Sequence, residues 1–200
     1  MVAVGQEFSN TRSGERFVWR ATRESTAGAY CEFDLHLAAG AKVAAAHVHP
    51  HQTETFTVVA GRIRLRAGHE ARELEAGGVG TIPPGTPHAW GNATGSPSHV
   101  VVRLAPALDI EDFFEAFCAV AAAGKAGRSG LPRNPLRLAV LLDAYRAELD
   151  FPSRGLRLVL SPVLALLAVL GRAVGLRPSP VPARAPVPLR RGAARRQRGR

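Results

Sequence analysis

Three histidines and one glutamate have the spacing of a single metal site: His47, His49, Glu54 and His88. His47 and His49 are two residues apart, so on a strand their imidazoles point to the same face. Glu54, on the strand that follows, can face the same interior. His88 comes just after the turn Pro83-Pro84-Gly85, where another strand would begin. The four side chains are therefore predicted to converge on one divalent ion.

Three imidazoles and one carboxylate suit Fe(II), Mn(II), Ni(II), Cu(II) or Zn(II), and the sequence does not choose among them. An ion that accepts five or six ligands would keep one or two positions for water, dioxygen or a substrate's oxygen atoms, which is a catalytic arrangement. Such an ion could act as a Lewis acid in isomerisation or decarboxylation. It could also bring dioxygen and an enolate-like substrate together for oxidative cleavage, with Glu54 doubling as a catalytic base.

Two segments contain these residues: GAKVAAAHVHPHQTETFTVVAG, from Gly40 to Gly61, and GGVGTIPPGTPHAWGN, from Gly77 to Asn92. They resemble the two motifs of the cupin superfamily, and the resemblance extends over roughly residues 25–105. The matching positions are Gly40, His47, His49, Glu54 and Gly61 in the first motif, and Gly77, Pro83, Gly85, His88 and Asn92 in the second. Gly40 is one residue farther from His47 than in the usual pattern, which predicts a longer turn or a small bulge. The resemblance implies a single cupin type-2 barrel with all four metal ligands present.

Three further residues are candidates for a substrate pocket. Phe56 is two residues beyond Glu54, and Trp90 is two beyond His88, so both should share the interior with the metal. They are either core side chains or pocket walls. His51 is expected at the rim, with a fifth ligand or proton carrier as its alternative role.

The barrel is predicted from short strands between glycine and proline turns, which run from Glu15 to about Leu104. Ile63 and Leu65 alternate with arginines, which places the apolar side chains on an inner face and the charges in water. The predicted fold class is thus all-β, a cupin or jelly-roll barrel with a C-terminal α-helical extension and a disordered basic tail.

After Pro106 the apolar spacing becomes helical. Three helices are predicted: one from Asp109 to before Gly124, one capped by Asn134 and ending before Pro152, and one from Ser161 to about Val174. The domains would be a barrel at residues 1–107, a helical extension at 108–176 and a Pro/Arg-rich tail at 177–200.

The stretch from Leu158 to Leu170 is almost wholly apolar but only 13 residues long. A membrane span needs roughly 20 apolar residues. We therefore expect a helix that packs on the barrel or on a partner subunit, or one that lies at a membrane interface.

The formal net charge of +10 is concentrated at the C-terminal end. Residues 1–150 are nearly neutral, whereas residues 151–200 contain eleven arginines and no acidic residue. No aromatic residue alternates with the tail arginines for base stacking, so specific nucleic-acid binding is not expected. We do expect a weak contact of the third helix and the tail with a membrane surface.

The leading functional hypothesis is a metal-dependent enzyme of the dioxygenase type that acts on a small organic molecule inside the barrel. The alternatives are a metal-dependent isomerase and a non-catalytic cupin that binds a metal or small ligand as sensor or carrier. A homodimer is expected from the family resemblance. A cytoplasmic location follows from the two unpaired cysteines and the lack of a secretory signal near the first residue.

Overall fold

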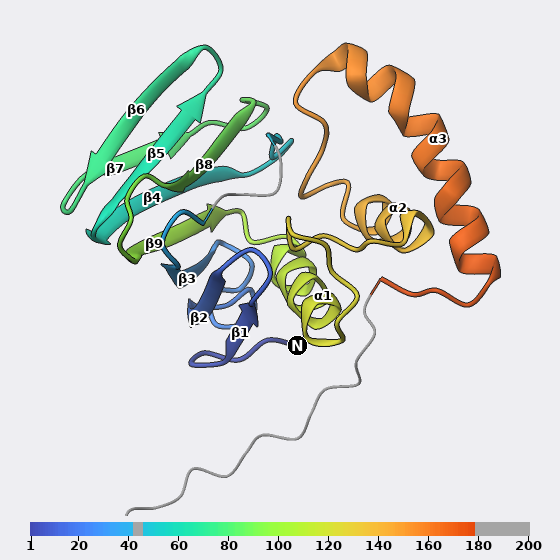
Figure 1. Ribbon diagram of the computed structural model, residues 1–200, viewed down its shortest axis with the longest axis horizontal. Coiled ribbons are helices and arrows are strands. Elements are labelled where there is room, and N and C mark those ends of the chain that lie inside the picture. Colours follow the sequence, from blue (N-terminus) through green and yellow to red (C-terminus); the bar gives the residue numbers. More distant parts are fainter. Residues whose placement is uncertain (42–45, 179–200) are drawn as a thin grey trace, which may run out of the picture.

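A computed structural model describes residues 1–41 and 46–178 and shows two antiparallel sheets followed by three helices (Figure 1). The larger sheet has the strand order β1-β2-β3-β9-β4-β7, and the smaller sheet has the order β6-β5-β8. The strands are β1 (Glu7–Asn10), β2 (Glu15–Ala21), β3 (Cys31–Leu37), β4 (Thr53–Ala60), β5 (Arg62–Ala67), β6 (Glu70–Glu75), β7 (Val79–Ile82), β8 (His88–Asn92) and β9 (Ser98–Ala105). The predicted jelly-roll barrel is confirmed.

The core between the sheets follows from strict alternation along the strands. On β3 every second residue is buried, including Phe33 and Leu35, and on β9 Val100 and Val102 are fully buried. Each such side chain contributes about 1.5–3 kcal/mol when it leaves water, so the alternation both places and stabilises the sheet.

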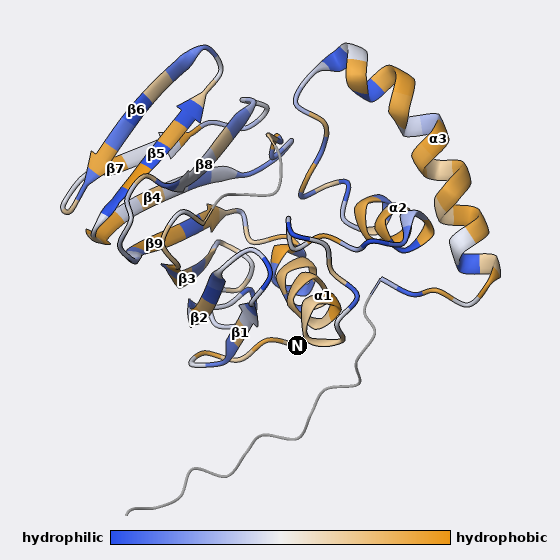
Figure 2. Cartoon of the chain, in the orientation of Figure 1, coloured by the Kyte–Doolittle hydropathy of each residue, from blue (hydrophilic) through white to orange (hydrophobic). Residues whose placement is uncertain are grey.

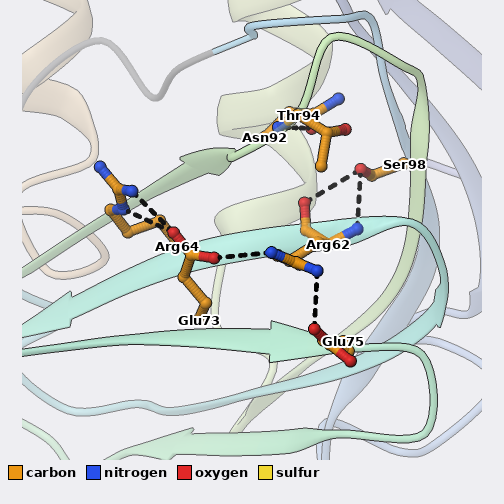
Figure 3. A network of polar contacts seen from close by, with 7 residues as sticks. All are labelled: Arg62, Arg64, Glu73, Glu75, Asn92, Thr94 and Ser98. Carbon is orange, nitrogen blue, oxygen red and sulfur yellow. Dashed lines mark hydrogen bonds and ion pairs between the residues drawn. The ribbon is translucent and has the colours of Figure 1, made fainter.

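The smaller sheet has the predicted division between an apolar and a charged face. Ile63 and Leu65 of β5 are buried, whereas the intervening arginines reach acidic residues of β6. Figure 3 shows this network, in which Arg62 contacts Glu73 at 3.1 Å and Glu75 at 2.7 Å, and Arg64 contacts Glu73 at 2.6 Å.

The helical extension comprises α1 (Ile110–Ala122), α2 (Pro135–Ala144) and α3 (Arg154–Ala173). Phe114 of α1 packs on the larger sheet, with ring centroids 4.7 Å from Phe17 and 5.3 Å from Phe33. The predicted cap of α2 is confirmed, because the Asn134 side chain accepts hydrogen bonds from two backbone amides of the first turn.

The predicted end of α2 was wrong. The helix ends at Ala144, well before Pro152, because the following residues turn back toward the barrel. There Asp150 forms an antiparallel bridge with Val48, with N–O distances of 3.0 and 3.1 Å. In this bridge the amide and carbonyl of Asp150 form hydrogen bonds with Val48, so they are not available for the hydrogen bonds of a longer helix.

The predicted start of α3 was also wrong. The helix begins at Arg154, where the Ser153 side chain caps it by accepting a hydrogen bond from the Leu156 amide, and Pro162 lies inside it. A proline removes one backbone hydrogen bond, and a helix of 20 residues retains most of the others. The argument from length against a membrane span therefore fails: among the described residues, this helix is long and apolar enough to cross a membrane by length and composition. The disordered tail was predicted at residues 177–200, of which residues 179–200 lie outside the described part of the chain.

Candidate metal centre

The two histidines of the first motif lie in the short segment that precedes β4. His47 forms an antiparallel bridge with His88, the first residue of β8, through N–O distances of 3.0 and 2.9 Å. The carbonyl of His49 accepts a hydrogen bond from the Gly85 amide at 2.8 Å. Gly85 has a φ of +73°, which a residue with a Cβ adopts only with strain. The second motif thus holds the backbone of the first in place.

Glu54 lies on β4, which is paired on both sides. Its partners in the sheet are Leu104 of β9 and Ile82 of β7. Because a strand with two neighbours has little freedom, the carboxylate is presented to the barrel interior from a rigid support.

The four predicted ligands come together. One candidate ligand atom from each of His47, His49, Glu54 and His88 lies within 4.8 Å of the other three. Atoms bound to one ion at about 2.0–2.2 Å are at most about 4.4 Å apart, so a small inward movement would suffice. Three of the side chains are buried, and His47 is partly buried.

Two of the imidazoles are oriented by backbone carbonyls. Nδ1 of His49 is 2.6 Å from the Glu148 carbonyl, and Nδ1 of His88 is 2.9 Å from the Thr86 carbonyl. A carbonyl can only accept, so each Nδ1 carries the proton and each Nε2 keeps its lone pair for the centre of the cluster.

The atoms at the centre lack hydrogen-bond partners. Oε2 of Glu54 and Nε2 of His88 are buried and make no hydrogen bond, although they are only 2.9 Å apart. Both belong to the group of candidate ligand atoms that lie within 4.8 Å of one another. A buried acceptor without a partner is costly, and a divalent cation would satisfy both atoms. The residues therefore fit the metal that their types imply.

Glu54 supplies the site with a negative charge. Burial alone would raise the pKa of Glu54, but the neighbouring His49 and His88 hold that pKa well below its usual range. Glu54 is thus ionised at neutral pH, as a ligand must be. Burial would lower the pKa of His88, but the contact with Glu54 outweighs burial and raises it.

Residues 33–103 match the family model of the cupin domain. This segment is a cupin domain. It contains all four ligands of the cluster and spans β3 to most of β9.

Solved structures with a similar barrel come from several organisms. The chain is similar to KdgF from Halomonas sp., at 18% identity over 55% of this chain and 94% of that one, with a TM-score of 0.47. It is similar to a predicted oxalate decarboxylase from Thermotoga maritima, at 17% identity over 53% and 99%, with a TM-score of 0.46. A third is the cupin domain of Cnp3 from Schizosaccharomyces pombe, at 15% identity over 54% and 72%, with a TM-score of 0.44. No curated protein matches the chain.

A cavity of about 190 Å³ lies between the cupin domain and the helical extension. His47, His49 and Glu54 line one part of it. The remaining wall is mostly apolar and comes from the three helices and the turns between them: Phe113, Phe114 and Phe117 of α1, Leu142 of α2, Leu164 of α3, and Leu131, Leu149 and Phe151. The sequence indicated that the phenylalanines share a helix but gave no sign that they face the metal ligands.

The cavity opens beside the first ligand segment. Arg146, Asp150 and Ser161 line both the cavity and an outer hollow. His51 lines this outer hollow and not the cavity, which places it at the rim. Its predicted role in the pocket is thus confined to the opening.

The two aromatic candidates of the cupin domain have different positions. Trp90 lines the cavity, whereas Phe56 is fully buried behind it, with ring centroids 5.4 Å apart. Phe56 therefore supports the wall without forming it.

Sequence reasoning missed Glu15, a nearly buried carboxyl at the start of β2 that also lines the cavity. Burial raises its pKa to about 7, although a hydrogen bond from Ser13 partly opposes this rise. The sequence gave no indication that Glu15 is buried, because a charged residue at the end of a strand is normally exposed to water.

The asparagine of the second motif has a structural role. The Asn92 side chain donates to the carbonyls of Ala38 and Ser96 and accepts from the amide and hydroxyl of Thr94. Figure 3 shows Asn92 beside Thr94. It closes the loop between β8 and β9.

Proposed function

We propose that the protein is a metal-dependent oxidoreductase of the dioxygenase type, which acts on a small, largely apolar organic molecule in the cavity. The observation that carries this proposal is the apolar cavity, one side of which is formed by three of the four ligand side chains. A site for metal storage alone would not need such a chamber.

When bound, a redox-active divalent ion would supply dioxygen activation and polarisation of the substrate's oxygen atoms. His47, His49, Glu54 and His88 would hold it. Glu54, the carboxylate of the candidate ligand set, would be the group that accepts a proton from an enolisable C–H group.

The walls of the cavity limit the substrate. A volume of about 190 Å³ is below the range of about 300–1,000 Å³ for drug-sized ligands, so the substrate is small. Phenylalanine and leucine side chains favour an apolar body and exclude water. We infer an enolisable compound with two adjacent oxygen atoms toward the ligands and a hydrocarbon part toward α1.

The metal part of the proposal is tested by elemental analysis of protein purified without chelator. We expect about one Fe, Mn, Ni, Cu or Zn per wild-type chain and almost none in a His49→Ala, Glu54→Ala double variant. His69→Ala is the matched control, because His69 is an exposed histidine outside the cluster and this variant should load like the wild type. A wild type that takes up none of the five ions would overturn the proposal.

The reaction type is tested with an oxygen electrode and a panel of small enolisable diketones. A dioxygenase consumes one O₂ per substrate lost, and this consumption should disappear in the double variant. Substrate conversion without O₂ uptake would instead indicate an isomerase. Saturable binding without any conversion would indicate a sensor or carrier.

A further inference from the structure

The side of α3 that points away from the rest of the protein is apolar. Val159, Val163, Leu166 and Leu170 recur at intervals of four, three and four residues, so they lie on one face. Their side chains are 48–68% exposed, and Leu158 and Val169 beside them are also exposed. We call these six residues the outer face of α3. Figure 2 shows the hydrophobic colouring along most of this helix.

The opposite side of α3 is fixed to the protein. Ala168 and Gly171 are buried against α2, and a Cβ on Gly171 would come within 2.6 Å of Val140. Ion pairs join Arg172 to Asp143 at 2.7 Å and Arg157 to Asp150 at 3.3 Å. The helix is therefore held along its length, while its outer face has no cover among the described residues.

An exposed apolar surface of this extent normally marks an interaction site. The charges near it identify the partner. The charged residues of α3 are Arg154, Arg157 and Arg172, and residues 179–200 add seven arginines without one acidic residue. An apolar helix face that is followed in the sequence by a strongly cationic segment complements an anionic lipid surface, where each basic residue near the membrane adds about 1 kcal/mol of attraction.

We propose that the outer face of α3 docks this protein on an anionic membrane surface. A second copy of the chain fits less well. Residues 151–200 contain eleven arginines and no acidic residue, so the same region of a second copy offers no charges to neutralise them.

The helix lies in the interface and does not cross the bilayer. Crossing would require α3 to leave α2 and to break the contacts of Gly171 and the two ion pairs. A helix in the interface keeps these contacts and buries only its outer face among the lipid headgroups and upper acyl chains. Because Leu158 also lines the outer hollow, docking would bring the opening of the cavity close to lipid.

The test is flotation of the full-length protein with vesicles of phosphatidylcholine alone or with 30% phosphatidylglycerol. We expect the wild type to float with the anionic vesicles, to bind neutral vesicles at least about tenfold more weakly, and to dissociate as salt is raised. A triple variant, Val159→Gln, Leu166→Gln, Leu170→Gln, should bind anionic vesicles at least about tenfold more weakly than the wild type.

The matched control is a Val59→Gln, Val79→Gln variant, which removes two valines on the barrel that are 48% and 55% exposed. It should float like the wild type. An unchanged thermal unfolding curve would show that the triple variant is folded. The salt dependence is measured on the wild type alone, so it tests the proposal even if the variant does not fold. The proposal is overturned if the wild type ignores anionic vesicles or if the triple variant binds as tightly as the wild type. It is also overturned if the wild type is a dimer in solution and the triple variant is a monomer, because the outer face would then join two copies.

Discussion

Glu15 is a buried carboxyl whose ionisation opposes folding. It is 7% exposed at the start of β2, and burial raises its pKa from 4.5 to about 7. Between these values the unfolded chain releases the proton and the folded chain keeps it. Stability therefore falls as the pH rises from about 4.5 to 7, and the full loss persists above 7.

The size of this loss follows from the shift. A difference of about 2.5 pKa units corresponds to about 3.4 kcal/mol at high pH, of which about 2.5 kcal/mol develops between pH 5 and pH 8. Glutamine has nearly the same shape and cannot ionise. The free energy of unfolding of Glu15→Gln, relative to that of the wild type, should therefore be about 2.5 kcal/mol higher at pH 8 than at pH 5.

The assay is urea denaturation of the metal-free proteins at half-unit steps from pH 5 to pH 8. Ser13→Ala is the companion variant, because the Ser13 hydroxyl lowers the pKa of Glu15 and its loss should move the fall in stability to higher pH. If the wild type and Glu15→Gln show parallel curves of unfolding free energy against pH, Glu15 does not retain its proton in the folded state and the reasoning fails.

Three further predictions concern the metal centre, the second motif and the helical extension. Metal affinity should weaken on acidification, because Glu54 raises the pKa of His88 above its usual value and protons then compete with the ion for this imidazole; equal affinities at pH 5 and pH 8 in a metal titration would contradict this. Asn92→Ala should lower the free energy of unfolding by about 2–4 kcal/mol, since four hydrogen bonds are lost, and a loss below about 0.5 kcal/mol in urea would refute that role. Gly171→Leu should destabilise the protein by about 1–3 kcal/mol through collision with Val140, and an unchanged melting temperature would show that α3 can move away freely.

The ligands could be predicted from the sequence because each is placed by local rules. His47 and His49 share a face through strand periodicity, and the turn at Gly85 sets His88 at the start of β8. The cap at Asn134 was equally local, and the structure confirms it. In each case the residue type and its immediate neighbours carry the information.

The cavity could not be predicted, because it depends on how distant segments pack. The Glu148 carbonyl that orients His49 is a backbone group, so any residue type at that position would serve. Phe113 and Phe117 fall within the helix predicted from Asp109 to before Gly124, but which surface they cover is set by the docking of α1. The predicted start of α3 at Ser161 was wrong because a proline such as Pro162 usually lies in the first turn of a helix. In the structure Ser153 is the cap, and Pro162 lies inside the helix.

The bridge between Val48 and Asp150 gives the helical extension influence over a metal that it does not bind. A shortened chain ending after β9 would retain every ligand, yet His49 would lose the acceptor of its Nδ1 proton and the cavity would lose most of its apolar wall. The helical extension therefore contributes both to the orientation of a candidate ligand and to the wall of the cavity. The barrel supplies all four candidate ligands, and substitutions at cavity-lining positions of the extension, such as Phe113 or Leu164, would change the shape of the space beside them.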